Sequence, residues 1–502
     1  MDTFQNMSVA ESFLRPLAEK RAWLPPFVVL CMAVFIWSAV GLGPYSGYNT
    51  PPQFGDFEAQ RHWMEITQHL DPRQWYFYDF DWWRLDYPPL TAFHSWLCGK
   101  VGAFFTPDWF ALDTSRGAED QGLKAFMRAS VVVSQLAVYA APAYVWTRQA
   151  AQHNSMAPTL AWASLLLFPC LTIIDHGHFQ YNAVMLGLCI GSFDDLVRRR
   201  FILASLLFVL ALFFKQMALY YAPVMFTAIL GFCIGPAVGW ELQLTRLITV
   251  GVTVLGTAAL LLIPFFDLDQ LAQIVTRVFP VFRGLWEDKV ANLWCTINFT
   301  GFKLKAHFSP QQLQLMALGA TLAAILPSCI AAFVGKPRVF VWALASCAWA
   351  FFLFSFQVHE KSVLLPLLPT MMAAVQHYKS ANIRAMTMWV SNVAYFSMWP
   401  LLKREGLHLQ YFVLIALYNW LFTERGAIMP RNWLNKLVVF GSYAGIFGIT
   451  MAEHFIPLPA ELGTLYPDLL VVGNMALSFV CFAYFWLWQS WYMLTLTTID
   501  NE

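Results

Sequence analysis

Six short polar segments interrupt an otherwise apolar sequence, and they hold most of the side chains that could take part in a reaction. These segments are 55–67, 85–91, 175–182, 215–220, 281–294 and 359–362. The carboxylate of Asp56, near the start of the first segment, is the type of group that takes a proton from a substrate hydroxyl. No CxxC or Cys/His spacing indicates a zinc site. The chemistry to expect is therefore acid–base chemistry.

The segment Gly55–Thr67 predicts a short amphipathic helix. At 3.6 residues per turn, Trp63, Ile66 and Leu70 share one face. The opposite face carries the polar residues Glu58, Arg61, His62, Glu65 and His69. A helix of this kind can lie along a membrane interface with its apolar face down.

Asp56 falls at the expected N-cap of this helix. A simple cap, worth about 1 kcal/mol, explains an aspartate at that position. Alternatively, the helix N-terminus keeps the carboxylate ionised, so that it can act as a base toward a substrate hydroxyl. The two roles are compatible, and the residue pattern leaves both open.

The segment Leu85–Thr91 contains a Tyr-Pro-Pro turn, because a residue before proline avoids the α region. The turn directs the chain back toward the membrane, and Asp86 is then either a cap or a functional carboxylate. Asp79-Phe80-Asp81 matches the metal-binding pattern D-x-D. Two acids separated by one loop residue are too short a pattern to predict a metal site.

The composition is that of a membrane protein. Of the 502 residues, 58% are hydrophobic and 12% are charged, whereas soluble domains have about 25% charged residues. Apolar stretches of about 20 residues, the length that crosses a bilayer, recur along the chain. The formal net charge of +1 gives no attraction toward nucleic acid, which we exclude as a partner.

The apolar stretches predict fourteen membrane-spanning helices in a single domain, 1–502. They are 23–43, 127–147, 158–174, 180–196, 201–217, 218–235, 246–266, 313–334, 338–357, 363–377, 385–402, 409–423, 433–453 and 469–494. Basic residues in the short loops place the N-terminus in the cytoplasm. Loops 44–126 and 267–312 then lie outside, and all six polar segments gather on that face. Counting Val101–Phe105 as a further span would place Arg198–Arg200 outside, so it stays within the first loop.

The polar segments resemble the dolichyl-phosphate-glucose-dependent α-1,3-glucosyltransferases of N-glycan precursor assembly. The sequence segments that carry the resemblance are GDFEAQRHWMEIT, QWYF, LDYPPLT, DHGHFQYN, KQM, RGLWEDKVANLW and HEKS. They occur in the same order as in the family, over the first three quarters of the chain. The long DFEAQRHWMEIT run (Asp56–Thr67) is closest to the enzyme that adds the first glucose.

This resemblance implies the GT-C fold, an all-α polytopic membrane protein with interfacial helices in the first lumenal loop. It implies the endoplasmic reticulum membrane, with the active site facing the lumen. The donor would be dolichyl-phosphate-glucose, and the acceptor an unglucosylated high-mannose oligosaccharide on dolichyl diphosphate. The β-linked donor and α-linked product imply inversion in a single displacement, without a covalent nucleophile and without a metal cofactor.

The resemblance implies the catalytic residue, and the polar segments supply the other candidate site residues. Asp56 would be the catalytic base. The predicted substrate-binding residues are Glu58, Arg61, Asp86, Tyr87, His176, His178, Gln180, Lys215, Arg283, Lys289, His359 and Lys361. The cations among them could stabilise the departing phosphate, although basic side chains near a membrane also extend to the interface without any such role. His176 and His178 could ligate a metal, but we expect them to bind sugar hydroxyls or phosphate.

Two other classes of function stay open at this point. One is the second-glucose transferase of the same family, which assays with defined acceptors would distinguish. The other is a lipid transporter or scramblase, which also has many spans and isolated charges. Transporters place polar groups near the bilayer midplane, often in repeated halves. Here the polar segments gather on one face and the halves do not match, which favours the enzyme.

Overall fold

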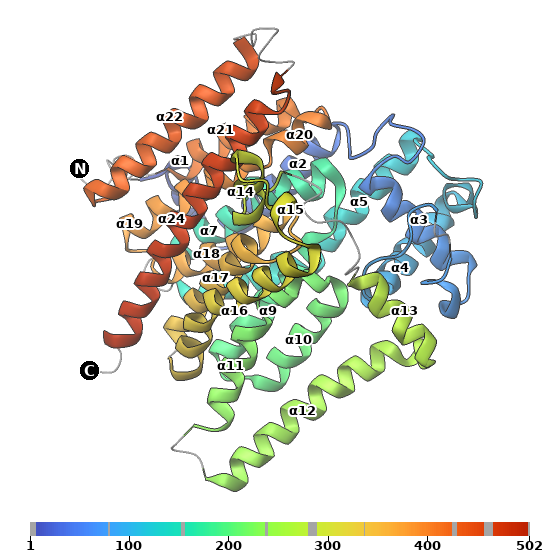
Figure 1. The fold of residues 1–502 in the computed structure, drawn as a ribbon, viewed down its shortest axis with the longest axis horizontal. Coiled ribbons are helices and arrows are strands. Elements are labelled where there is room, and N and C mark those ends of the chain that lie inside the picture. The colour runs from blue at the N-terminus through green and yellow to red at the C-terminus, as the bar shows by residue number, and fades with distance from the viewer. Residues whose placement is uncertain are drawn as a thin grey trace.

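A computed structural model describes residues 7–78, 81–151, 156–235, 239–279, 289–335, 337–423, 429–455 and 465–499. Over these ranges the regular structure is helical (Figure 1). The α-helices are α1 (Val9–Lys20), α2 (Leu24–Gly41), α3 (Asp56–His69), α4 (Pro89–Phe105), α5 (Gln121–Gln135), α6 (Ala141–Ala150), α7 (Ala157–Leu166), α8 (Pro169–Thr172), α9 (Asn182–Val197), α10 (Phe201–Phe214), α11 (Ala222–Cys233), α12 (Trp240–Leu262), α13 (Leu268–Val278), α14 (Leu293–Thr300), α15 (Leu304–His307), α16 (Pro310–Val334), α17 (Pro337–Phe354), α18 (Leu364–Gln376), α19 (Ala381–Ser397), α20 (Trp399–Arg404), α21 (His408–Phe422), α22 (Trp433–Phe455) and α24 (Leu469–Ile499).

The prediction of an all-α polytopic membrane protein is confirmed. Each of the fourteen predicted segments contains a helix. Among the described residues, eight helical segments are long and apolar enough to cross a bilayer: Leu24–Gly41, Gln121–Ala150, Ala157–Phe179, Trp240–Phe265, Pro310–Val334, Pro337–Phe354, Trp433–Phe455 and Leu469–Thr497. The shorter helices α10 and α11 are also apolar. The total of fourteen spans therefore stays a prediction.

The spans differ in what surrounds them. Ala157–Phe179 is buried over almost its whole length, so it forms part of the centre of the bundle. Helix α12 is exposed on nearly every side and carries leucine, isoleucine and valine there. An apolar helix that is exposed all round is stable only in a lipid environment. The arrangement is a packed bundle with α12 at its edge (Figure 1).

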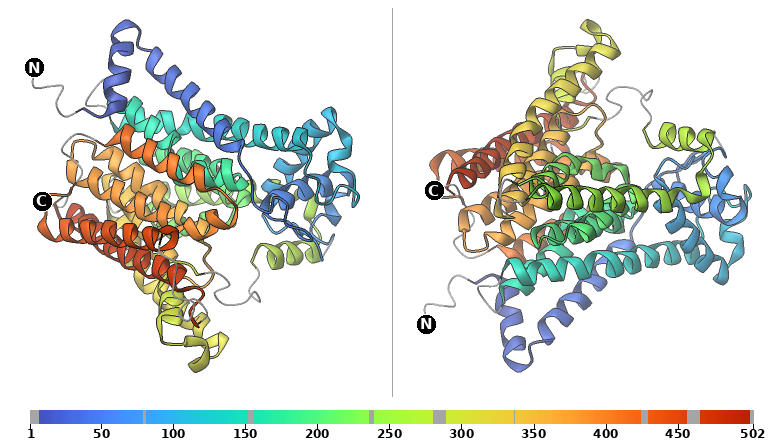
Figure 2. Two further views of the ribbon diagram at one scale, coloured as in Figure 1. Left: turned by 90° about the horizontal axis from the view of Figure 1, so that it is seen from above. Right: turned by 90° about the horizontal axis from the view of Figure 1, so that it is seen from below.

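One end of the bundle carries a cluster of short elements, which we call the loop end. It consists of α3, α4, α13 and the 3₁₀ turn η3 (Pro107–Phe110). The start of α1 and the end of α24 lie toward the opposite end (Figure 2). This placement agrees with the predicted topology, in which the first loop and the two termini are on different sides.

Helix α3 confirms the predicted helix at Gly55–Thr67, but the predicted N-cap is wrong. Gly55, rather than Asp56, is the N-cap, and Asp56 is the first helical residue. The polar face does not meet solvent, because Glu58, Arg61, His62 and Glu65 are all buried. The sequence could not show this burial, since the segment that covers the polar face lies about fifty residues further along the chain.

The stretch Val101–Phe105 is the end of α4 and not a separate span. The helix has 17 residues and packs beside α3, with Val101, Phe104 and Phe105 exposed. Exposed phenylalanines next to a bundle of spans indicate contact with lipid.

We expect Asn298 to be glycosylated, because Asn298-Phe-Thr is an acceptor sequence. Asn298 lies on α14. Trp294 of the same helix donates a hydrogen bond to the carbonyl of Phe354 (2.8 Å), which is the last residue of α17. The chain continues from this end of α17 to Lys361, so α14 lies on the same side of the bundle as the polar site. Asn298→Gln should therefore abolish an endoglycosidase-sensitive shift in electrophoretic mobility. Cysteine labelling at position 298 only from the cytoplasmic side would contradict the topology.

Candidate active site

The carboxylate of Asp56 lies at the centre of a group of polar side chains from distant parts of the chain. Its Oδ2 accepts hydrogen bonds from Lys361 Nζ (2.6 Å) and His178 Nε2 (2.9 Å), and a third from Gln180 Nε2. Burial alone would raise the pKa of Asp56. The charges of Lys361 and His178 outweigh that effect and hold the pKa well below its usual range. Asp56 is therefore an ionised carboxylate with one oxygen already engaged.

The backbone before α3 brings Asp56 to this position. Gly47 has φ +81°, a conformation that side chains other than glycine rarely adopt. A Cβ at Gly47 would also overlap the backbone of Gly55, so the chain passes itself closely here. Ser46 connects both sides of the site: its N–H donates to the carbonyl of His178 (2.9 Å), and its Oγ accepts from the N–H of Asp56 (3.2 Å).

A π-helical segment, η5 (Ile173–Phe179), supplies His178. Phe179 has φ +91°, and Gln180 follows in an extended conformation. This change of direction lets both His178 and Gln180 reach Asp56. A non-glycine residue at positive φ costs of order 1–3 kcal/mol and persists only where its surroundings enforce it. Such residues concentrate at functional sites.

His176, two residues before His178, points elsewhere. Its Nε2 lies 2.6 Å from Gln135 Oε1, and its ring stacks on Trp37 with 5.1 Å between centroids. The two histidines therefore do not converge on a shared ligand. His176 holds η5 against the helices behind it.

Lys215 lies immediately behind the site. Its Nζ donates to Gln180 Oε1 (2.9 Å) and to Asn182 Oδ1 (2.7 Å), and it sits 4.8 Å from the centre of the Tyr87 ring. The ammonium group is fully buried, where an unpaired charge would be expensive. Lys215 thus fixes the orientation of the Gln180 amide, which in turn donates to Asp56.

Asp56 opens onto a cavity of about 180 Å³ between the loop end and the bundle. Six of the predicted site residues line it: Asp56, Asp86, Tyr87, Gln180, His359 and Lys361. The sequence prediction did not include the other polar and aromatic lining residues: Gln60, Trp63, Trp83, Asn182, Gln216 and Arg277. The neighbouring aromatic residues Trp75, Tyr76 and Trp82 of the first loop do not line the cavity. Apolar side chains complete the wall: Met185, Leu186, Met217, Leu364 and Leu365.

Lys289 does not line the cavity. It pairs with Asp468 at 2.7 Å, and Arg283 lies outside the described residues, as does Asp79 of the D-x-D pattern. Glu58 and Arg61 do not line the cavity either, although they belong to the same helix as Asp56. Direct contact of these two with substrate is therefore not supported, because both charges are already paired.

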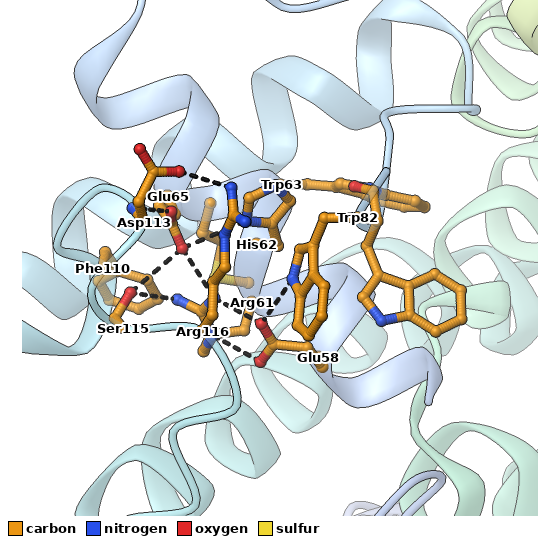
Figure 3. Close-up of polar contacts among 12 residues, drawn as sticks. Glu58, Arg61, His62, Trp63, Glu65, Trp82, Phe110, Asp113, Ser115 and Arg116 are labelled. Carbon is orange, nitrogen blue, oxygen red and sulfur yellow. Dashed lines mark hydrogen bonds and ion pairs between the residues drawn. The ribbon is translucent and has the colours of Figure 1, made fainter. Parts of the chain in front are cut away.

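Arg61 is the centre of a second buried ionic cluster, shown in Figure 3. Its guanidinium donates to Glu58 (2.6 and 2.7 Å), to Glu65 (2.7 Å) and to Ser115 (2.6 Å). Burial would raise the pKa of Glu65, but the hydrogen bond from His62 and the charge of Arg61 lower it to about 2. This cluster attaches α3 to the segment 109–115 and so fixes the helix that begins with Asp56.

Glu405 is a further charged residue at the site that the sequence prediction missed. Its Oε1 lies 2.6 Å from His178 Nδ1, on the opposite side of the imidazole from Asp56. It follows α20, in a part of the chain without a recognisable motif. A single sequence gives no signal for this contact, since 227 residues separate the two partners.

A membrane-embedded helical bundle with an ionised carboxylate beside a polar cavity is an arrangement that fits an integral membrane transferase. Residues 28–488 match the model of the ALG6, ALG8 glycosyltransferase family, and the chain belongs to this family. It is 44% identical to the probable dolichyl pyrophosphate Man9GlcNAc2 alpha-1,3-glucosyltransferase of Schizosaccharomyces pombe over 498 residues, covering 97% of this chain and 96% of that protein. The Saccharomyces cerevisiae dolichyl pyrophosphate Man9GlcNAc2 alpha-1,3-glucosyltransferase is 40% identical over 96% of this chain and 93% of its own length. The protein of the same name from Gallus gallus is 41% identical over 397 residues, which are 78% of this chain and 77% of that protein.

We expect Arg61→Met to destabilise the loop end by about 3–5 kcal/mol, because it leaves two carboxylates buried without their cation. The midpoint of thermal unfolding of the purified protein should fall, and activity should fall with it. Arg116→Met is the matched control, because Arg116 pairs with Asp113 near the surface, where an ion pair contributes about 0–1 kcal/mol. Equal effects of the two substitutions would contradict a central role for Arg61.

Proposed function

We propose that this protein transfers glucose from dolichyl-phosphate-glucose to Man9GlcNAc2 on dolichyl diphosphate, forming the first α-1,3-glucosyl linkage of the N-glycan precursor. The observation that carries the proposal is the ionised carboxylate of Asp56 on the wall of a cavity that also holds Lys361, His359 and Arg277. One group to take a proton and several cations to receive a phosphate are what a single displacement on a sugar phosphate requires.

The names of the related enzymes support the acceptor and the reaction class. The donor and the location in the endoplasmic reticulum, with the site facing the lumen, follow from the resemblance of the polar segments. The same holds for the GT-C fold with about fourteen spans. The polar site lies at one end of an apolar bundle, which is consistent with this donor, this location and this fold.

Asp56 would act as the base through its second oxygen. Oδ2 accepts all three hydrogen bonds from Lys361, His178 and Gln180, so we assign Oδ1 to the acceptor hydroxyl. The low pKa makes Asp56 a weak base toward an alcohol. Proton transfer must therefore accompany formation of the glycosidic bond, when the hydroxyl has become much more acidic.

The departing dolichyl phosphate would be stabilised by cations and hydrogen-bonding side chains on the wall of the same cavity. Lys361, His359 and Arg277 line it, and the last comes from α13 of the loop end. Burial would lower the pKa of Lys361, but the carboxylate of Asp56 raises it, so the ammonium group stays charged. In a site with little water, such a cation interacts strongly with developing negative charge.

Aromatic and polar side chains of the cavity suit a sugar ring. Trp63 and Trp83 line it, and each indole N–H donates to a backbone carbonyl, which fixes the ring. A fixed indole presents an apolar face against which the carbon-bound hydrogens of a pyranose can pack. Asp86 and Gln60 supply groups that can bind the hydroxyls.

The decisive test uses purified protein, synthetic dolichyl-phosphate-glucose and acceptors that differ only in the glucoses they already carry. We expect transfer to the unglucosylated acceptor. Transfer only to the monoglucosylated acceptor would indicate the second-glucose enzyme. Lipid movement across vesicles without any glucose transfer would indicate a scramblase.

In this assay Asp56→Asn should reduce the rate by about 10²–10⁴-fold, the usual contribution of a general base. The amide keeps the shape of the side chain and loses the proton acceptor. Asp108→Asn is the control, since Asp108 is an exposed carboxylate of the same loop region. Wild-type turnover by Asp56→Asn, at unchanged protein level, would remove Asp56 from the mechanism.

We further expect Lys361→Met to move the acidic limb of the pH–rate profile to higher pH. In the wild type, Lys361 and His178 keep the pKa of Asp56 below its usual range, so the base stays ionised on acidification. Without Lys361, the effect of burial is less opposed, and Asp56 takes up a proton at a higher pH. Lys403→Met, at the surface pair with Glu453, should leave the limb in place. If the acidic limb of Lys361→Met lay at the wild-type pH, Lys361 would not be the group that lowers the pKa of the catalytic base.

A further inference from the structure

The imidazole of His178 lies between two carboxylates. Nδ1 is 2.6 Å from Glu405 Oε1, and Nε2 is 2.9 Å from Asp56 Oδ2 and 3.0 Å from Lys361 Nζ. The side chain of His178 is 2% exposed and that of Glu405 is 9% exposed. An ionised carboxylate can only accept a hydrogen bond, so the contacts with Glu405 and Asp56 place a proton on each ring nitrogen. The ring is thereby held in one of its two possible orientations.

The fold presents Glu405 to this histidine through a tight turn. Glu405 caps the C-terminus of α20, and Gly406 follows with φ +72°. The N–H groups of Gly406 and Leu407 return to the carbonyls of Lys403 and Leu402 (3.1 and 3.0 Å), which closes the helix end. Glu405 is thus held by backbone geometry, and Oε2, its other oxygen, is buried without a hydrogen-bond partner among the described residues.

We propose that Glu405 is a positioning residue for the glucosyl transfer: its negative charge holds the doubly protonated His178 ring in the orientation in which the Nε2–H points at Asp56. This inference rests on the proposed role of Asp56 as the base. Without the carboxylate, the ring could turn by 180° about its Cβ–Cγ bond. Carbon atoms would then face Asp56, which would lose one of its three hydrogen bonds.

Other charges around Glu405 do not replace its contact with His178. Arg128 is near enough to interact electrostatically with Glu405, but its guanidinium donates to the carbonyls of Gly177 (2.7 Å) and Pro44 (3.1 Å). The neighbouring Arg404 lies 3.8 Å from Glu360. Of His178, Arg128 and Arg404, it is therefore the imidazole of His178 with which Glu405 makes a short hydrogen bond.

Two substitutions separate a role for the charge from a role in packing. Glu405→Gln keeps the size and an acceptor oxygen but removes the charge, whereas Glu405→Asp keeps the charge and shortens the side chain. We expect Glu405→Gln to lower kcat roughly 10- to 100-fold, as when the partner that orients a functional histidine is removed. The KM values for donor and acceptor should change by no more than about twofold. Glu405→Asp should retain more activity than Glu405→Gln.

The matched control is Glu453→Gln, because Glu453 is a carboxylate of the same region that pairs with Lys403 and Trp399. It should keep the wild-type rate. Wild-type kcat in Glu405→Gln, or more activity in Glu405→Gln than in Glu405→Asp, would overturn the proposal, because packing favours the isosteric amide. Loss of the folded state in both variants would also overturn it, since Glu405 would then be structural. An active Asp56→Asn enzyme would instead refute the proposed function.

Discussion

The structure depends on one constraint: several charges are withdrawn from water at the place where the loop end meets the bundle, and each must find a partner. A buried unpaired charge costs several kcal/mol, far more than a typical surface ion pair returns. Asp56 can occupy its position only because Lys361, His178 and Gln180 reach it from the bundle. The same contacts attach α3 to helices that are distant in sequence. Catalytic geometry and the docking of the loop end are therefore one interaction.

Helix α3 satisfies this constraint in two places. At its first residue, Asp56 meets cations from the bundle, and further along the helix Arg61 meets Glu58 and Glu65. The second cluster is internal to the loop end and holds the helix at a fixed angle to segment 109–115. The side chains of Ala59, Gln60 and Trp63 are then directed to the cavity. A helix fixed in this way places a carboxylate more precisely than a mobile loop would.

Local patterns in the sequence were sufficient for the helices and for part of the site. The long apolar stretches predicted fourteen helical segments, each of which contains a helix, and the motif residues Asp56, Asp86, His359 and Lys361 do line one cavity. Contacts that depend on three-dimensional packing could not be predicted. The residues of the polar face of α3 do not indicate that a segment fifty residues away covers it. Glu405 and Arg277 come from regions without a motif, and only the fold brings them to the site.

The position of Lys361 explains how a carboxylate of low pKa could serve as the base. Lys361 both pairs with Asp56 and lines the cavity, where the donor phosphate is proposed to bind. In the proposed reaction, Asp56 becomes neutral when it takes the hydroxyl proton, and the leaving phosphate gains one negative charge in the same step. The negative charge therefore passes from one neighbour of Lys361 to another, while the ammonium group stays charged. Because charge separation in a site with little water is costly, a cation that contacts both the base and the leaving group stays paired with a negative charge throughout the transfer.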